Sequence, residues 1–522
     1  MKSFKLSILS TVFVLLTLSA FAQKSVTIKV LQTSDVHGAV FPYDFIRNQP
    51  MDASLANVYN YVKQERANVN QQVILLDNGD ILQGQPPVYF SNFIDDTKQN
   101  LISRVFNFMK YDAVTIGNHD IETGPKVYRA IEKELKMPLM AANAINSKTG
   151  KPAFKPYTII KKDGVKIAVL GLTTPGIPHW LPKILWPDMH FEDMIITANY
   201  WVKHIKKKEK PHIIIGLFHS GHDATYGGGS ATKPKNENAS LLVAQQVPGF
   251  DVILIGHDHD KLCKKFANIN GDSVLVMDPT SGARLISEAT IVVNLDKKGK
   301  LQNKSVKGEL IDTKKFKADA DFMANFANDY KKVEDFVKRP IGEFTQTMTS
   351  ANAYFGPTEF IDFIHSAQLN LTKADVSFVA PLSFVSTIKK GQVTVSDMFK
   401  LYRFENFLYT MSLTGKEIDG FLEHSASVWF NTMKSADDNL IKFKTSADGS
   451  IQKNQQGKVQ LVANFYNFDS AAGIIYTVDV SKPDGDKVTI HSMANGTPFD
   501  ENKTYSVAIN SYRGNGGGGH LT

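Results

Sequence analysis

Short polar clusters rich in aspartate and histidine follow six apolar runs in the first half of this 522-residue chain. Carboxylate oxygens and imidazole nitrogens are ligands that divalent transition metals take in proteins. One cluster alone would mean little, but repeated clusters of this chemistry at the ends of strand-like runs indicate a site for two metal ions. The clusters are Asp35-Val36-His37, Asn78-Gly79-Asp80, Gly117-Asn118-His119-Asp120, His219-Ser220-Gly221-His222, Gly256-His257-Asp258-His259 and, the weakest, Asp278-Pro279-Thr280.

The residue types and spacing within these clusters suit a pair of cations. Asp35 and His37 alternate on an extended backbone, so both side chains can face the same side. Asp80 has two carboxylate oxygens that can bridge two cations, and Asn118 offers a neutral carbonyl oxygen. Two metals roughly 3.5–4 Å apart would activate a shared hydroxide and neutralise a phosphoryl group during in-line displacement. The imidazole ligands would come from His219, His257 and His259.

Several of these residues also have an explanation that involves no metal. Gly79-Asp80 on its own is typical of a turn, and Asp278 beside a proline is another turn former. His222 is compatible with a loop position or with a role in supporting a ligand, and Asp258 and Asp260 with solvated loop carboxylates. The joint occurrence of the clusters favours the metal site over these separate explanations.

The elements that must position the clusters are alternating strands and helices. Each cluster follows an apolar, β-rich run, and α/β proteins bind their ligands at the carboxyl ends of such strands. The chain therefore predicts an α/β catalytic domain with the clusters gathered at one edge of its sheets. The predicted strands cover 26–31, 73–76, 113–116, 167–172, 213–218, 252–255, 274–277 and 291–295, and the predicted helices cover 55–69, 99–109 and 125–135.

The second half of the chain predicts a separate domain, because 522 residues exceed one comfortable hydrophobic core. A charged amphipathic helix over 314–337, followed by Pro340, is the expected bridge. The expected organisation is a signal peptide at 1–22, a catalytic domain at 23–313, a bridging helix or linker at 314–340 and a C-terminal domain at 341–522. The second domain should contain helices over 357–371, 395–402 and 415–429, strands over 406–413, 473–480 and 505–509, and a glycine-rich loop over 516–519.

The N-terminus has the pattern of a secretory signal peptide. Lys2 and Lys5 precede an apolar stretch, and Ala20-Phe21-Ala22 provides small residues at the cleavage offsets. The mature chain is expected to start at Gln23 and to be secreted, into the periplasm of a bacterium. No later run is long enough to span a membrane, and the single cysteine, Cys263, excludes an intramolecular disulfide.

The charge balance limits the kinds of partner. Apolar residues make up 43% and charged residues 21% of the chain, which is ordinary for a globular protein. The formal net charge is +7, or +5 without the two signal-peptide lysines. This mild excess can attract phosphorylated substrates. A concentrated basic stripe is absent from the sequence, so binding to duplex nucleic acid is not indicated.

Four motifs of this chain, in their order along the sequence, resemble those of calcineurin-like metallophosphoesterases. They are Asp-x-His, Gly-Asp, Gly-Asn-His-Asp and Gly-His-x-His. With the C-terminal segment, the chain after Gln23 resembles the secreted two-domain family of 5′-nucleotidases and 2′,3′-cyclic-nucleotide phosphodiesterase/3′-nucleotidases. The resemblance implies an α/β (α+β) fold, in which a four-layer α/β/β/α sandwich is joined to a C-terminal α/β substrate domain. It also implies that Asp35, His37, Asp80 and His259 hold one metal, and that Asp80, Asn118, His219 and His257 hold the other.

The same resemblance implies catalytic roles around the third motif. His119 would be the phosphate-facing histidine that stabilises charge or protonates the leaving alkoxide. Glu122 stands where many family members carry an aspartate that orients this histidine, and Asp120 follows the histidine directly. His259 stands where 5′-nucleotidases often carry glutamine, and the mixed ligand set suits Zn²⁺, Mn²⁺ or Fe²⁺.

In the family, one aromatic side chain from each of two C-terminal loops sandwiches the nucleobase. Such π faces hold any base with little demand on its hydrogen-bonding groups. Counting from the glycines that follow places Phe468 and Tyr512 in these roles, with Tyr466 as the alternative on the first loop and Phe465 in the core. The expected substrate contacts are Phe468, Tyr466, Tyr512, Arg513 and the metal-centre residue Asn118.

The substrate branch is indicated by two segments of the second domain. Residues 380–383 and 393–408 resemble the cyclic-phosphodiesterase branch, and Leu382-Ser383-Phe384 replaces the Asn-Gly-Gly-Ile-Arg loop of typical 5′-nucleotidases. The sequence thus predicts a 2′,3′-cyclic-nucleotide 2′-phosphodiesterase with 3′-nucleotidase activity, releasing nucleoside and phosphate. The alternatives are a 5′-nucleotidase or UDP-sugar hydrolase with the same metal site, and a non-catalytic nucleotide-binding surface protein. The sequence does not indicate an oligomeric state.

Overall fold

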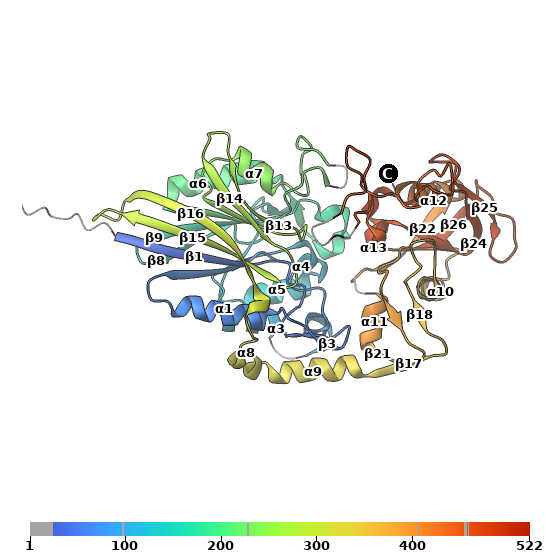
Figure 1. Ribbon diagram of the computed structural model, residues 1–522, viewed down its shortest axis with the longest axis horizontal. Helices are drawn as coiled ribbons and strands as arrows, with labels where there is room; N and C mark the ends of the chain where they lie inside the picture. The colour runs from blue at the N-terminus through green and yellow to red at the C-terminus, as the bar shows by residue number, and fades with distance from the viewer. Residues whose placement is uncertain are drawn as a thin grey trace, which may run out of the picture.

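The computed structural model describes residues 24–96, 99–226, 229–402, 405–453, 457 and 459–521. Figure 1 shows a larger N-terminal body built on long strands and a smaller C-terminal body, with the yellow helix α9 running beneath toward the second body. The predicted signal peptide lies outside the described residues. No helix in the described ranges is long and apolar enough to cross a membrane.

The N-terminal body contains two six-stranded sheets. The first has the order β16-β15-β1-β4-β5-β6 and the second β13-β14-β12-β11-β9-β8. Central neighbours such as β1 and β4, or β9 and β11, are parallel, so their carboxyl ends point to the same edge. The strands are β1 (Lys24–Thr33), β4 (Gln72–Asp77), β5 (Ala113–Thr115), β6 (Leu139–Met140), β8 (Tyr157–Lys162), β9 (Val165–Thr173), β11 (Ile213–His219), β12 (Val252–Ile255), β13 (Lys261–Ala267), β14 (Ser273–Pro279), β15 (Leu285–Leu295) and β16 (Leu301–Asp312), with short pairs β2 (Tyr43–Asp44) with β3 (Gln49–Pro50) and β7 (Ala144–Asn146) with β10 (Met189–Phe191).

The two sheets pack face to face and helices cover their outer faces. Ile28 and Val30 of β1 share one buried cluster with Val169 and Ile215 of the second sheet. Buried clusters on the outer faces join the first sheet to α1, α3 and α5 and the second sheet to α6 and α7. This confirms the predicted four-layer α/β/β/α sandwich. The helices are α1 (Leu55–Ala67), α2 (Pro86–Tyr89), α3 (Leu101–Met109), α4 (Asn118–Glu122), α5 (Pro125–Glu134), α6 (Met194–Lys208) and α7 (Ser240–Gln246).

The segment expected to be one bridging helix is interrupted. It contains α8 (Ala320–Asn325) and α9 (Ala327–Lys338), and Phe326 between them has φ −109° and ψ 16°, which breaks the helical path. Phe322 and Phe326 are buried with α1 and α3, so the segment covers the first sheet before it enters β17 (Pro340–Phe344). The bridge therefore packs along the N-terminal body.

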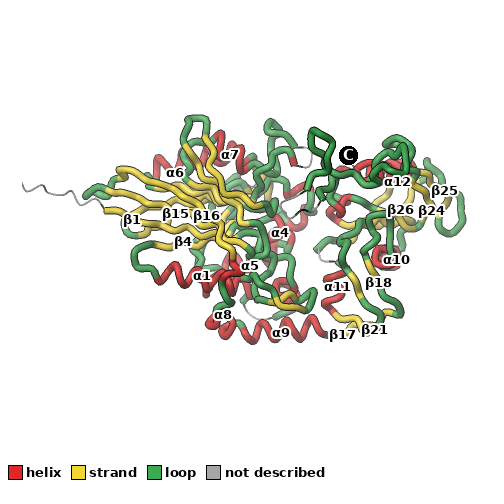
Figure 2. The backbone as a smooth tube through the Cα atoms, in the orientation of Figure 1, coloured by secondary structure: helices red, strands yellow, loops and turns green. Residues whose placement is uncertain are grey.

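The C-terminal body is built on a four-stranded sheet of order β22-β26-β19-β23. Phe360 of α10 packs against Val379 in one buried cluster, and Phe421 of α12 packs against Phe378 in another. Figure 2 shows this smaller sheet on the side away from the long strands. Its elements are β18 (Met348–Thr349), α10 (Glu359–Thr372), β19 (Val376–Val379), β20 (Thr387–Ile388), β21 (Gly391–Thr394), α11 (Val395–Leu401), β22 (Leu408–Thr414), α12 (Gly415–Trp429), β23 (Ser470–Ala472), β24 (Ile474–Val478), β25 (Val488–Met493), β26 (Thr504–Asn510) and α13 (Ser511–Gly514).

Candidate metal centre

The predicted metal ligands lie at the carboxyl ends of strands from both large sheets. Asp35 follows β1, Asp80 follows β4, Asn118 begins α4 after β5, and His219 ends β11. The structure gathers six of the seven into two groups whose ligand atoms lie within 4.8 Å of one another, and the Asn118 Oδ1 atom lies 3.1 Å from His219 Nε2. The groups are Asp35, His37 and His259, and Asp80, His219 and His257.

In the first group, two imidazole rings point their nitrogens at each other. His37 Nε2 lies 3.0 Å from His259 Nε2, and His259 Nε2 lies 3.4 Å from Asp35 Oδ1. His37 Nδ1 donates to the main-chain carbonyl of Gln83 at 3.1 Å, which directs Nε2 to the site. Two facing nitrogens need a proton or a cation between them, so this arrangement fits a bound metal.

In the second group, His219 Nε2 lies 3.1 Å from Asp80 Oδ2. Its Nδ1 atom donates to the Asn78 carbonyl at 2.6 Å, which fixes the ring orientation as metal-binding histidines require. Burial would raise the pKa of Asp35 and Asp80, but the surrounding histidines hold both pKa values below the ordinary range. Neither carboxylate pairs with Lys or Arg within the described part of the chain. Buried acids with imidazole neighbours are a donor set that divalent cations satisfy.

The backbone at these ligands is unusual. Five of the seven predicted ligands have a positive φ, where residues other than glycine are strained by about 1–3 kcal/mol each. Such strain persists only when the surrounding structure determines it, and it concentrates at functional sites. The five are Asp35 (φ 50°), His37 (φ 47°), Asp80 (φ 54°), His257 (φ 83°) and His259 (φ 58°).

His119 and Glu122 form a close pair on α4. The His119 Nδ1 atom lies 2.5 Å from Glu122 Oε2, and the His119 ring centroid lies 5.5 Å from that of His37. Burial disfavours the charged imidazole, but the carboxylates of Glu122 and Asp80 outweigh it and raise the pKa of His119 to about 9. The structure thus places a histidine, oriented by a buried glutamate, beside both ligand groups.

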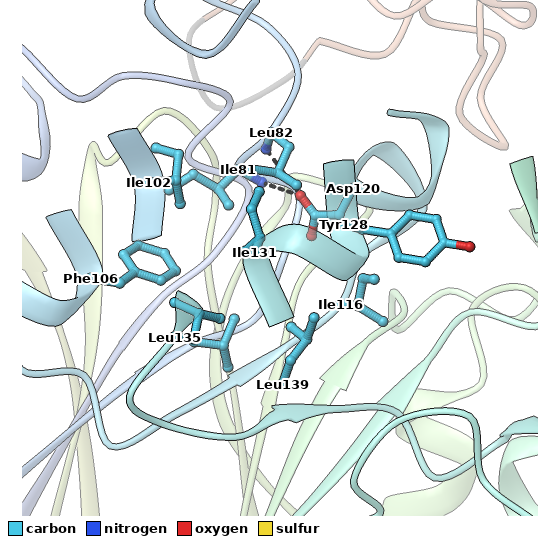
Figure 3. Close-up of a pocket in the computed structure, with 11 residues that line it drawn as sticks. Ile81, Leu82, Ile102, Phe106, Ile116, Asp120, Tyr128, Ile131, Leu135 and Leu139 are labelled. Carbon is cyan, nitrogen blue, oxygen red and sulfur yellow. Dashed lines mark hydrogen bonds between the residues drawn. The ribbon is translucent and has the colours of Figure 1, made fainter. Parts of the chain in front are cut away.

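Asp120, which was predicted to be catalytic, lies where its carboxylate binds backbone N–H groups. Figure 3 shows its carboxylate among apolar side chains, with hydrogen bonds from the backbone of Ile81 and Leu82, each 3.0 Å long. It also accepts the N–H groups of Asp80 at 2.9 Å and Gly117 at 2.8 Å. Asp120 therefore holds the loop that carries Asp80, and its oxygens are used for that purpose. Burial and the nearby Asp80 raise the pKa of this carboxyl group.

The predicted base-binding aromatics were Phe468 and Tyr512, with Tyr466 as the alternative to Phe468, and in the structure it is Tyr466 that lies beside Tyr512. Their ring centroids lie 6.2 Å apart at an interplanar angle of 86°, and both rings are partly buried. Phe468, expected to stack on the base, is only 7% exposed and stacks on Trp429 at 5.0 Å. Because the faces of Phe468 are used inside the C-terminal core, Tyr466 replaces it as the candidate on that loop. Phe465 packs against Phe384, as expected for a core residue.

Arg513 was expected to contact substrate, but the structure buries it. Its side chain is 1% exposed and pairs with Asp469 at 2.6 Å. It also donates to the Tyr466 carbonyl at 2.8 Å and to the Gly517 carbonyl. Arg513 therefore ties together the two loops that carry the tyrosines, and these contacts support a structural role for it.

His222 lies outside both ligand groups. Its Nδ1 atom pairs with Asp258 Oδ2 at 3.0 Å, and its Nε2 atom lies 3.6 Å from Asp260 Oδ2. Of the explanations left open by the sequence, the structure thus favours a loop ion pair for these three residues.

Sequence reasoning missed three residues that border the site. The Trp180 ring centroid lies 5.5 Å from that of His257, and Glu237 Oε1 lies 3.5 Å from His257 Nε2. The Tyr226 hydroxyl lies 3.3 Å from that of Tyr466, across the two bodies. All three lie in long connecting segments without a strand or helix period, so only the folded chain reveals them.

Comparison with known families and proteins identifies the class of protein. The calcineurin-like phosphoesterase family matches residues 28–261, and the 5′-nucleotidase C-terminal domain family matches residues 340–522. A 2′,3′-cyclic-nucleotide 2′-phosphodiesterase/3′-nucleotidase of Yersinia enterocolitica is 27% identical, covering 97% of this chain and 83% of that protein. Protein UshA of Escherichia coli is 26% identical over 79% of each chain.

A solved structure from Staphylococcus aureus, assigned as a 5′-nucleotidase in complex with alpha-ketoglutarate, is also similar. It has a TM-score of 0.77 and 25% identity, covering 95% of this chain and 92% of that one. The fold and the site therefore define a metal-dependent phosphoesterase, which is a hydrolase. The chain joins a calcineurin-like phosphoesterase domain, matched over residues 28–261, to a 5′-nucleotidase C-terminal domain, matched over residues 340–522.

Proposed function

We propose that this enzyme hydrolyses 2′,3′-cyclic nucleotides and 3′-nucleotides. Water opens the cyclic phosphate at its 2′-oxygen to give a 3′-phosphomonoester. A second water then releases nucleoside and inorganic phosphate. The observation that carries the proposal is that two metal-ligand groups with His119 and Glu122 lie on one body and the Tyr466–Tyr512 pair on the other. The two bodies meet through Tyr226 with Tyr466 and through Trp180 with Asn515.

The roles of the chain's own residues follow from their positions. Divalent cations held by the two ligand groups, with Asp80 and Asn118 shared or adjacent, would supply Lewis acidity and an activated water nucleophile. His119, oriented by Glu122, protonates the leaving sugar oxygen. Tyr466 and Tyr512 contact the base through their aromatic rings, a mode of binding that places little demand on the hydrogen-bonding groups of the base. Zn²⁺, Mn²⁺ and Fe²⁺ all suit this mixture of nitrogen and oxygen donors.

The choice of substrate branch is supported by the segment at Leu382-Ser383-Phe384. Phe384 stacks on Tyr354 with centroids 3.6 Å apart, so this place is filled by aromatic packing where the 5′-nucleotidase loop carries an arginine. The relative from Yersinia enterocolitica carries the name of this branch. The second candidate, a 5′-nucleotidase or UDP-sugar hydrolase, is favoured by the similarity to the Staphylococcus aureus structure.

The test is a parallel assay of the mature chain loaded with Zn²⁺, Mn²⁺ or Fe²⁺. The substrates are 2′,3′-cyclic AMP, 3′-AMP, 5′-AMP and UDP-glucose, and the products are measured by chromatography. We expect the first two to have the higher kcat/KM, with 3′-AMP appearing as an intermediate from the cyclic substrate. A several-fold preference for 5′-AMP would refute the branch assignment. If none of the four substrates is hydrolysed, the proposed activity is refuted.

Export belongs to the same proposal. The N-terminal charge and hydropathy pattern supports secretion into a periplasm, where nucleotides from outside the cell are available. Fractionation of expressing cells, with detection of a mature chain that starts at Gln23, tests this part directly.

A further inference from the structure

Glu237 lies beside the candidate metal centre without being one of its predicted ligands. Its Oε1 atom lies 3.5 Å from His257 Nε2, and its side chain is 28% exposed. The group formed by Asp80, His219 and His257 does not include it. The Glu237 carboxylate therefore approaches His257 from outside the ligand group and keeps one face open.

The main chain at Glu237 is firmly held. Its carbonyl oxygen accepts hydrogen bonds from the Thr174 hydroxyl at 3.0 Å and from the Ser220 hydroxyl at 2.7 Å. Among the described residues, the ion-pair partner of the carboxylate is His257, whose Nε2 atom lies 3.5 Å from Oε1. A partly exposed carboxylate on an anchored main chain, with accepting capacity left, can receive a donor from a ligand.

The His257 side of the site also borders the tyrosine pair. The Trp180 ring packs on His257, and the Trp180 carbonyl accepts from Asn515 Nδ2, three residues after Tyr512, at 3.5 Å. Tyr226, from the same connection as Glu237, meets Tyr466 through their hydroxyl groups at 3.3 Å. Burial is the main cause of the raised pKa of Tyr512, and the negative charge of Glu237 adds to it.

These contacts place Glu237 beside the ligand groups, on the side of the site where Trp180 meets the loop that carries Tyr512. The phosphate belongs at the ligand groups and the base belongs at the tyrosines, so the ribose lies between them. We infer that Glu237 accepts a hydrogen bond from a ribose hydroxyl and so positions the sugar. This inference rests on the proposed function, and it assigns Glu237 as a specificity-determining residue on the catalytic body.

The experiment compares Glu237→Gln with the unaltered enzyme on 3′-AMP and on its 2′-deoxy and 5′-deoxy counterparts. Hydrogen bonds to charged groups contribute enough that the unaltered enzyme should lose roughly 10- to 100-fold in kcat/KM with one deoxy substrate. The variant should show that same loss with 3′-AMP and no further loss with the deoxy substrate. The change should fall mainly in KM, because the contact is present in the ground state.

A purely structural role, in which Glu237 only orients His257, predicts a different outcome. The variant would then lose metal, as measured by elemental analysis, and would lose rate equally on all three substrates. Loss of metal, or an equal loss of rate on all three substrates, overturns the inference. Glu192→Gln is the matched control, because Glu192 Oε1 pairs with His190 Nε2 at 3.0 Å outside the site, and it should change neither KM nor metal content.

Failure of the proposed function is recognised separately. If the unaltered enzyme prefers 5′-AMP, the branch assignment is wrong, and the same comparison is made with 5′-AMP and its 2′-deoxy and 3′-deoxy counterparts. Equal sensitivity of variant and unaltered enzyme to every missing hydroxyl, in both substrate series, overturns the role of Glu237 whichever branch holds.

Discussion

At the scale of single residues, three histidines of the candidate site are each held by a second group. The Asn78 carbonyl orients His219, the Gln83 carbonyl orients His37, and Glu122 orients His119. These partners fix which ring nitrogen is free to face the site. Such preorganisation is what metal binding and proton transfer need.

His119→Ala tests the proposed proton donor. We expect kcat to fall by roughly 10²- to 10⁴-fold, because the leaving oxygen loses its general acid. Metal content should stay normal, since His119 belongs to neither ligand group. Steady-state kinetics and elemental analysis on the same preparation check both statements. An unchanged kcat would remove His119 from the mechanism.

Residue types alone led to the ligands but not to every role. Asp35, His37, Asp80, His219, His257 and His259 were predicted because their chemistry repeats after each strand, and the structure gathers them. Asp120 and Phe468 are of residue types, and lie in motifs, that also fit functional residues. Their roles depend on the backbone N–H groups and aromatic rings around them, which come from distant parts of the chain.

At the scale of elements, buried strands were the most predictable feature. Central strands of a sheet covered on both faces need continuous apolar runs, and β12 (Val252–Ile255) appears with the predicted bounds. The long strand β16 (Leu301–Asp312) was missed because it is a polar sheet edge. Helix α6 (Met194–Lys208) was expected only at its charged end, although its buried residues Met194, Ala198, Val202 and Ile205 follow a helical spacing.

Arg513→Ala tests the connection between the two tyrosine loops. Removing one partner of a buried ion pair leaves Asp469 uncompensated, which costs about 3–5 kcal/mol of unfolding free energy. We expect a lower urea midpoint together with a higher KM, because Tyr466 loses its carbonyl partner. A higher KM with an unchanged midpoint would instead favour direct contact between Arg513 and substrate. Arg513→Lys, which keeps the charge, should recover part of the stability.

His365 of α10 predicts a pH dependence of stability in the C-terminal body. It is 1% exposed, its two ring nitrogens meet Ser377 and Ser470 hydroxyls at 3.0 and 3.1 Å, and burial lowers its pKa to about 4. Between about pH 6.5 and pH 4 the unfolded chain binds the extra proton. Stability is therefore complete above pH 6.5 and falls by roughly 3 kcal/mol as pH drops to 4.

The measurement is urea unfolding of the full chain across this pH range, followed by fluorescence. His365→Asn should be less stable at neutral pH but should lose the pH-dependent part assigned to His365. An identical slope in variant and unaltered protein would assign the effect to other groups.

At the scale of the whole molecule, the proposed activity needs both bodies. The ligand groups and His119 come from the large sheets, and the tyrosines come from loops of the C-terminal body. Contacts at Tyr226–Tyr466 and Trp180–Asn515 join the two sides at the site. The sequence predicted that two domains follow one another along the chain, but not how they meet. Contacts between distant loops produce no periodic pattern in the sequence from which they could be predicted.

The most direct test of the account is the metal content of the mature chain. After reconstitution with Mn²⁺ or Zn²⁺ and removal of free metal, we predict two ions per chain by elemental analysis. Anomalous scattering should place them at the Asp35–His37–His259 and Asp80–His219–His257 groups, and His37→Ala or His219→Ala should each retain one. One ion or none in the unaltered chain, or scattering peaks elsewhere, would contradict a two-metal phosphoesterase.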